Sequence, residues 1–336
     1  MTRSAPRFAR LAAVLAAGFS AMPIVARSPD LLAYPGSDGT SGAAVGQSVP
    51  ASPRFRSGVD LVALDVCVKG GDGRLIEGLS ADDFLIVENN TPQRVTFFSP
   101  DERVPLAVAL LIDQSQSMYG EKLDRAKLAA VAFIGTLRPA DLVEVIAFSA
   151  RASRLFPLAS PENAAEQAIA GLRATGTTGL FEATLVALRD LERAQRDRPT
   201  EYRNAIVILS DGEDTSSLVA FEDVLEDVRR SGVLVYGLSL RTDERGRSLG
   251  PLREISQFAF DSGGQTVAVQ NLGSLVPTFQ EIGTDLRHLY RLGYVPSPLV
   301  RDGRWHSISV RVPGKDVRVR TRSGYYAPRS PMGGDR

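Results

Sequence analysis

Few residues in this sequence are of the types that carry thiol, imidazole or zinc chemistry. The 336 residues include one cysteine, Cys67, and two isolated histidines, His288 and His306. One cysteine cannot form an internal disulfide, and no Cys/His cluster has the spacing of a zinc site. The sequence also lacks a G-x-S-x-G elbow, a P-loop and a Cys/His dyad. We therefore expect no enzyme of these classes, and we interpret Cys67 as a small buried apolar side chain.

Net charge is also absent, because 39 Lys and Arg residues balance 39 Asp and Glu residues. Nothing in this balance indicates a nucleic acid or another polyanion as partner. The 43% hydrophobic and 23% charged content is ordinary for a globular protein. A chain of this length can hold one large core and a smaller second domain.

The amino-terminal residues have the charge order of an export signal. Arg3, Arg7 and Arg10 precede the small and apolar run 11–25, and basic residues followed by an apolar segment are typical of secretory signals. We expect a signal peptide at 1–26 and a secreted or periplasmic protein. If the segment stays uncleaved, it would instead anchor the chain in a membrane.

The rest of the chain divides into five segments. Residues 27–56 are rich in Ser, Pro, Gly and Ala, which predicts a flexible linker. Segments 57–100 and 290–327 have the pattern of short strands and turns, and neither has enough strands to stand alone. Between them, 101–289 alternates strand and helix patterns, which predicts βαβ units. We expect an α/β fold with a doubly wound, mostly parallel, Rossmann-like sheet, inserted into or flanked by a small β-sandwich, and a disordered tail at 328–336.

The candidate site begins where a buried strand ends. Residues 104–112 are β-branched and aliphatic with almost no polar interruption, which predicts a strand buried on both faces. Asp113, Ser115 and Ser117 follow, at the sheet edge where open α/β folds bind ligands. Their alternate spacing lets both hydroxyls point the same way from an extended turn. These oxygens suit hard cations; alternatively, the three residues only cap the next helix.

Two further loops carry oxygen donors. One holds Thr177 and Thr178 between two glycines, ahead of a predicted helix. The other follows a second buried strand and holds Asp211, Glu213 and Asp214. Loops that leave adjacent parallel strands converge over helix N-termini, so we expect these donors near Asp113. Glu213 and Asp214 fit a solvated turn, with contact to metal or ligand as the alternative.

The three motifs together resemble a von Willebrand factor type A domain, over about residues 104–289. The matching stretches are Asp-x-Ser-x-Ser-Met-x-Gly at 113–120, Gly-Thr-Thr-Gly-Leu-Phe-Glu at 176–182 and Ile-Leu-Ser-Asp-Gly at 208–212. Three such motifs in order after buried strands are far more specific than any one alone. The flanks are similar to the VWFA-related proteins of acidobacteria, in Gly-Leu-Ser-Ala-Asp-Asp-Phe at 78–84 and Arg-Ser-Gly-Tyr-Tyr at 322–326.

The resemblance implies a metal-ion-dependent adhesion site. The implied metal residues are Asp113, Ser115, Ser117, Thr178 and Asp211. In such sites the hydroxyls contact Mg²⁺ and the acids act largely through water, which leaves the cation free to take an Asp or Glu from a partner. Thr177 is the alternative threonine. Gln116 stands where a small residue is usual, and it could offer an amide oxygen or narrow the access.

We therefore expect a non-enzymatic, Mg²⁺-dependent module that binds a protein partner through an acidic residue. Mn²⁺ and Ca²⁺ are alternative ions, and no other cofactor is expected. A second interpretation is a structural scaffold in which the cation only joins loops. A third is a metal-dependent hydrolase with Asp113 as nucleophile, although phosphoaspartyl enzymes usually place a second acid where Ser115 stands.

Overall fold

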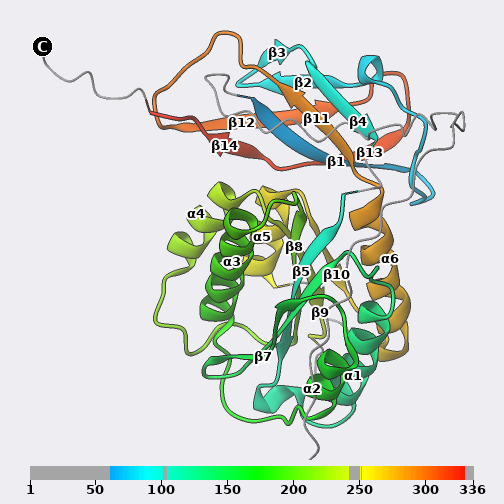
Figure 1. Cartoon of the computed structure of the whole chain (residues 1–336), viewed down its shortest axis with the longest axis vertical. Coiled ribbons are helices and arrows are strands. Elements are labelled where there is room, and N and C mark those ends of the chain that lie inside the picture. The colour runs from blue at the N-terminus through cyan, green and yellow to red at the C-terminus, as the bar shows by residue number, and fades with distance from the viewer. Residues whose placement is uncertain (1–60, 101–103, 242–249, 251, 330–336) are drawn as a thin grey trace, which may run out of the picture. The chain divides into compact units, whose positions relative to one another are not determined.

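The computed structural model describes residues 61–100, 104–241, 250 and 252–329. Three β-sheets and six α-helices form within these ranges (Figure 1). The expected signal peptide, 1–26, and linker, 27–56, lie outside the described residues, as does the end of the expected tail, 330–336. Within the described ranges no helix combines the length and the apolar character needed to cross a bilayer.

The largest sheet has six strands in the order β10-β9-β8-β5-β6-β7. β5 (Leu106–Asp113) lies in its interior and pairs in parallel with β6 (Leu142–Phe148) and β8 (Arg203–Ser210). β9 (Leu234–Ser239) and β10 (Gln265–Ala268) continue in parallel, and β7 (Ala152–Ala159) forms the antiparallel edge. Every residue of β5 is buried, because the sheet is covered on both faces.

Side chains along β5 alternate between two hydrophobic cores. Its even-numbered apolar residues face one core and its odd-numbered ones the other, as the period of two of a strand requires. Helices α1 (Glu121–Ile134), α2 (Asn163–Ala170) and α6 (Leu275–Arg287) cover the first core. Helices α3 (Leu180–Asp197), α4 (Phe221–Ser231) and α5 (Arg253–Ser262) cover the second (Figure 1).

Eight short strands form two further sheets, both antiparallel, in the orders β13-β1-β11-β4 and β14-β12-β2-β3. The strands before the α/β region are β1 (Val62–Gly70), β2 (Leu85–Glu88), β3 (Thr91–Gln93) and β4 (Phe97–Pro100). Those after it are β11 (Tyr290–Tyr294), β12 (Trp305–Arg311), β13 (Val317–Arg320) and β14 (Gly324–Tyr326). Each sheet thus combines strands from both segments.

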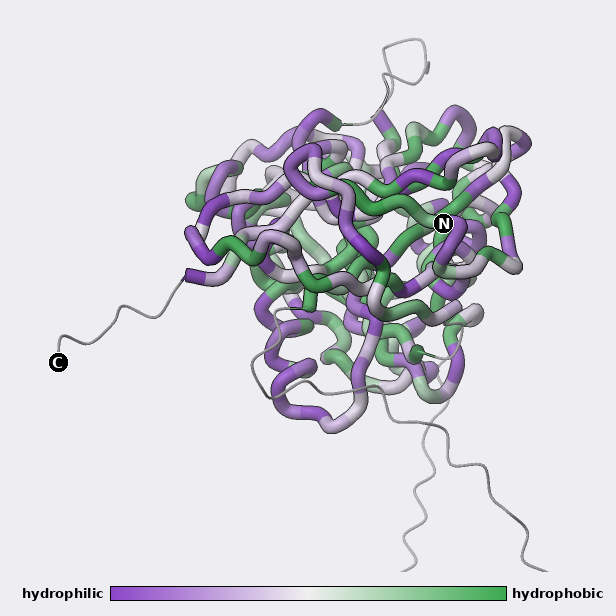
Figure 2. The backbone as a smooth tube through the Cα atoms, turned by 90° about the horizontal axis from the view of Figure 1, so that it is seen from above, coloured by the Kyte–Doolittle hydropathy of each residue, from purple (hydrophilic) through white to green (hydrophobic). Residues whose placement is uncertain are grey.

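The two antiparallel sheets share one core, which makes them a small β-sandwich. Leu64 and Val66 of β1 pack in the same apolar cluster as Ile86 of β2 and Val310 of β12. Seen from above, hydrophobic residues concentrate in interior stretches of the tube and hydrophilic ones toward its periphery (Figure 2). Neither four-stranded sheet has an apolar core without the other, since a single sheet leaves one face in water.

The expected α/β fold class with flanking antiparallel sheets is confirmed, but two elements were not predicted. β7 buries only Phe156, and its other side chains are half-buried or exposed, so it lacks the apolar alternation that identifies a strand. α5 is a short helix of 10 residues that ends at Gly263, whose φ is +90°.

Buried ion pairs join the end of α6 to the sandwich. The buried carboxylate of Asp285 lies 2.8 Å from Lys69 Nζ of β1 and 2.8 Å from an Arg320 guanidinium nitrogen of β13. Arg203, buried at the start of β8, donates to the backbone carbonyl oxygen of Leu286 at 2.8 Å. The same guanidinium lies 3.4 Å from the Asp65 carboxylate of β1. These contacts fix α6 against both the parallel sheet and the sandwich.

Asp285→Ala is expected to lower the free energy of unfolding by about 3–5 kcal/mol, because Lys69 and Arg320 lose their shared buried carboxylate. Glu281→Ala is the matched control. Glu281 also lies 2.8 Å from Lys69, but its side chain is 61% exposed, and an exposed pair contributes at most about 1 kcal/mol. Denaturant unfolding of both variants measures the difference, and equal losses would contradict a structural role for Asp285.

Candidate functional site

Two parallel strands end side by side at the candidate site. In the β5–β8 ladder Ile112 lies opposite Leu209, so the residues that follow, Asp113 and Ser210, are neighbours. Ser210 Oγ donates a hydrogen bond of 2.6 Å to Asp113 Oδ2. The chain passes from β5 to β6 on one side and later reaches β8 on the other. The site therefore lies at the switch point of the sheet, where α/β folds bind ligands.

The carboxylate of Asp113 is buried, and both of its oxygen atoms accept hydrogen bonds. Oδ1 accepts from the backbone N–H of Ser115 at 2.7 Å, which closes an Asx turn, and Oδ2 accepts from Ser210. Burial raises the pKa of Asp113 above its usual value, these hydrogen bonds oppose the rise, and the nearby charge of Asp211 adds to it. The site thus disfavours negative charge and would be stabilised by a cation.

The loop after β5 forms a short 3-10 helix, Gln116–Met118, so the expected extended turn is wrong. A tight turn nevertheless brings the two serine hydroxyls together, with 3.0 Å between Ser115 Oγ and Ser117 Oγ. Ser117 Oγ also donates to Asp211 Oδ1 at 2.6 Å. The loops that follow β5 and β8 are therefore joined through side chains.

Backbone hydrogen bonds hold the threonine loop against both other loops. The N–H of Gln116 donates to the carbonyl oxygen of Gly176 at 3.0 Å, and the N–H of Thr215 donates to that of Thr178 at 2.8 Å. Gly176 has φ +75°, a conformation that a residue with a Cβ rarely adopts. These two backbone hydrogen bonds determine the position of the Thr178 side chain.

Thr178 and Thr177 differ in their surroundings. Thr178 is 5% exposed, and its hydroxyl makes no hydrogen bond within the described residues. A Cβ built on Gly212 would lie 3.2 Å from Thr178 Oγ1 and 3.8 Å from Ser117 Oγ. Glycine at this position therefore leaves the space between the two hydroxyls open, whereas the Thr177 side chain is exposed to solvent.

The other three candidate contact residues lie apart from this cluster. Gln116 is exposed, and the largely exposed Glu213 carboxylate pairs with Arg241 at 3.1 Å. Asp214 Oδ2 accepts from the backbone N–H of Phe181 at 2.9 Å. Asp214 thus caps the first turn of α3, where negative charge is favourable.

Lys122 is a site residue that the sequence reasoning missed. Its ammonium group, in the first turn of α1, forms an ion pair with Asp211 Oδ2, while the Asp211 side chain is almost completely buried. The available signal is its position, since a basic residue at the start of α1 lies near the loop that carries Ser115 and Ser117. Lys122 supplies positive charge next to two neighbouring carboxylates.

The residues present fit a hard divalent cation. Three hydroxyl groups, from Ser115, Ser117 and Thr178, border one region with the carboxylates of Asp113 and Asp211 behind them. Such oxygen donors suit Mg²⁺, Mn²⁺ or Ca²⁺ better than ions that prefer thiolate or imidazole. Within the part of the chain that the structure describes, no group of three or more His, Cys, Asp or Glu side chains is placed to hold a metal, so an ion here would depend on the hydroxyls.

Comparisons with known proteins identify the family of the α/β domain. The family model for the von Willebrand factor type A domain matches residues 107–281, and the chain belongs to this family. Inter-alpha-trypsin inhibitor heavy chain H4 of Bos taurus is 30% identical over 146 residues, which are 41% of this chain and 16% of that protein. The chain therefore spans only a small part of the length of this relative.

Two solved structures are also similar. A von Willebrand factor type A protein from Catenulispora acidiphila has a TM-score of 0.49 and 14% sequence identity, and covers 83% of this chain and 76% of its own. Proximal thread matrix protein 1 from the mussel byssus, with a zinc-occupied MIDAS motif, has a TM-score of 0.45 and 14% identity, and covers 59% of this chain and 49% of its own.

Asp113→Asn is expected to raise the stability of the chelator-treated protein at pH 7. An amide avoids burying a charge, and Ser210 Oγ can accept from it while donating to the Gly212 carbonyl oxygen at 3.2 Å. Because the folded-state pKa of Asp113 is raised, its contribution to stability is largest below the unfolded pKa and falls as pH rises through the folded pKa. The denaturant concentration at the unfolding midpoint, measured between pH 4 and 8, should fall less steeply with rising pH in the variant than in the wild type. If the midpoint changed with pH equally in the wild type and the variant, the burial of the Asp113 charge would be contradicted.

Proposed function

We propose that the chain is a divalent-cation-dependent protein-binding module. The observation that carries the proposal is the convergence of the Ser115, Ser117 and Thr178 hydroxyls at the carboxyl ends of β5 and β8. In this proposal the three hydroxyls hold the ion, while Asp113 and Asp211 act behind them. Thr178 is preferred to Thr177 because its hydroxyl is the one that borders the space next to Ser117.

The hydrogen bonds of the two acids support an ion position in which hydroxyl groups, and not these carboxylates, contact the metal directly. Asp113 already accepts from Ser115 and Ser210, and Asp211 accepts from Ser117 and pairs with Lys122. Hydroxyl ligands do not neutralise a divalent cation, so the bound ion would attract a further anionic oxygen ligand. We propose that an Asp or Glu side chain of a protein partner supplies it, with Mg²⁺ as the ion and Mn²⁺ or Ca²⁺ as alternatives.

A binding role is preferred to catalysis. A nucleophilic aspartate needs a free oxygen directed at its substrate, whereas both oxygen atoms of Asp113 are engaged by neighbouring donors. The scaffold alternative shares the same ion site. It differs in predicting no affinity for carboxylate ligands once the ion is bound.

We further propose that the module acts outside the cytoplasm. The support is the order of basic and apolar residues at 1–26, followed by the Ser-, Pro- and Gly-rich segment 27–56.

In the same proposal, 101–289 is the ion-binding domain. Segments 57–100 and 290–327 form the sandwich, and 328–336 is the tail.

Calorimetric titration of Mg²⁺ or Mn²⁺ into the chelator-treated protein is expected to show one ion per chain. Ser117→Ala and Thr178→Val should weaken ion binding by about 10-fold to 100-fold, because each removes an oxygen donor that water replaces only in part. Thr177→Val is the matched control and should bind as the wild type does. Weaker binding in Thr177→Val alone, or no binding in a folded wild type, would overturn the assignment.

A second titration distinguishes the protein-binding module from the structural scaffold. A peptide that contains glutamate is expected to bind only when the ion is present, and the same peptide with glutamine is expected not to bind. If the ion raises the melting temperature but the glutamate peptide does not bind, the scaffold interpretation is correct.

A further inference from the structure

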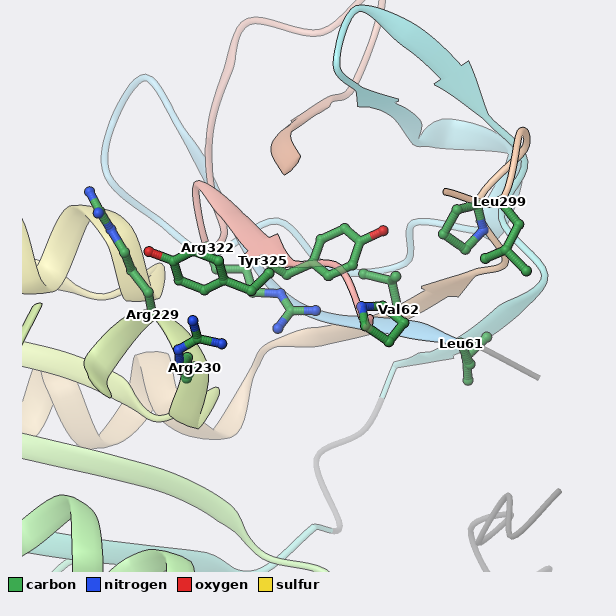
Figure 3. Close-up of a pocket in the computed structure, with 10 residues that line it drawn as sticks. Leu61, Val62, Arg229, Arg230, Leu299, Arg322 and Tyr325 are labelled. Carbon is green, nitrogen blue, oxygen red and sulfur yellow. The ribbon is translucent and has the colours of Figure 1, made fainter. Parts of the chain in front are cut away.

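A pocket of about 330 Å³ lies between the end of α4 and the sandwich strand β14 (Figure 3). Pockets that bind small molecules start at about this volume. Three arginines line it, Arg229, Arg230 and Arg322, together with Tyr325 and Tyr326. Leucine, valine and proline side chains complete the wall. The pocket therefore combines positive charge with apolar and aromatic surface.

Two of the three arginines have acidic partners, and one does not. Arg229 pairs with the buried Asp261 at 2.8 Å, and Arg230 pairs with Glu226 at 2.6 Å. Within the described residues the guanidinium of Arg322 makes no hydrogen bond and no ion pair, and its Nε is buried without a partner. Arg322 is thus the pocket arginine without a paired carboxylate, and its guanidinium carbon lies 5.8 Å from the centroid of the Tyr325 ring.

The surroundings make this unpaired charge costly. Burial lowers the pKa of Arg322, and the tyrosines Tyr294 and Tyr325 and the acid Asp65 oppose this only in part. Asp65 cannot serve as a dedicated partner, because it lies 3.4 Å from both Arg203 and Arg291. Arg322 is half-buried, and a guanidinium held partly out of water without an acceptor carries a desolvation cost that a bound anion would offset.

Figure 3 shows the guanidinium groups of Arg230 and Arg322 on the same side of the pocket, while the Arg229 side chain extends away from them. The ring of Tyr326 lies against Arg230, 4.0 Å from its guanidinium carbon. Leu61 and Leu299 lie at the far end of the pocket. One end is therefore suited to an oxyanion and the other to an apolar body.

We propose that this pocket binds a small organic oxyanion, a carboxylate or phosphate attached to an apolar or aromatic group. The planar fork of Arg322 can donate two parallel hydrogen bonds to such an anion, and Arg230 adds a second positive charge. The apolar part of the ligand contacts Leu61, Leu299 and Tyr325.

This site is separate from the ion site. α4 begins after the Asp211 loop and ends at Gly232, just before β9 starts. Because α4 runs back along the sheet, Arg229 and Arg230 lie toward the amino ends of the parallel strands. Asp113 and Ser210 lie at the carboxyl ends. Binding here would be a second activity of the chain that does not depend on the cation.

Calorimetric titration of the whole chain with phenyl phosphate, benzoate and benzyl alcohol tests the proposal. Phenyl phosphate or benzoate should bind, and whichever binds more tightly identifies phosphate or carboxylate as the anion; benzyl alcohol should not bind. Arg322→Met should weaken anion binding by about 10-fold or more, as expected for loss of charged hydrogen bonds. Arg311→Met removes the same charge from an exposed position on β12 and should bind as the wild type does.

Thermal unfolding separates a ligand-binding arginine from a structural one. Arg322→Met should raise the melting temperature of the ligand-free protein, because it removes a half-buried charge that no carboxylate pairs. A lower melting temperature would show a structural role and overturn the proposal. So would the absence of binding by both anions, unchanged binding in Arg322→Met, or an equal loss in Arg311→Met.

Discussion

The parallel pairing of β5 with β8 is the constraint on which the rest of the site depends. It places Asp113 next to Ser210, and the hydrogen bond between them fixes the carboxylate toward the loops. The serine hydroxyls can converge only because the loop after β5 folds back on this carboxylate through the Ser115 N–H. Asp211 follows Ser210 directly and accepts from Ser117, so one strand ladder organises two of the three loops.

The ladder in turn depends on burial of both sheet faces. Apolar side chains of β5 alternate between two cores, and each core needs three helices to cover it. The sandwich holds one of these helices in place, because Asp285 of α6 is bound by Lys69 and Arg320 from strands on either side of the α/β region. The sandwich therefore stabilises the sheet without taking part in the ion site.

The sequence was informative where local pattern and burial coincide. The uninterrupted apolar run before Asp113 predicts a central strand, and the polar residues after it can be located from that strand alone. The choice between Thr177 and Thr178 needed the structure, because the side chains of adjacent residues point in different directions. The backbone hydrogen bond from Thr215 to Thr178 determines which of the two is buried. The position of Lys122 near the serine loop could be read from the sequence, but its pairing with Asp211 and the capping of α3 by Asp214 could not, since each partner is distant in sequence. β7 and α5 were missed because the strand buries a single side chain and the helix is too short to show a clear period.

The most direct test of the ion site is anomalous diffraction from crystals of the whole chain grown with Mn²⁺. We predict one manganese peak between the hydroxyls of Ser115, Ser117 and Thr178, at about 2 Å from their oxygen atoms. The Asp113 and Asp211 carboxylates should lie behind these hydroxyls. A peak beside Glu213 and Asp214, or no peak at saturating Mn²⁺, would contradict a hydroxyl-built cation site at the ends of β5 and β8.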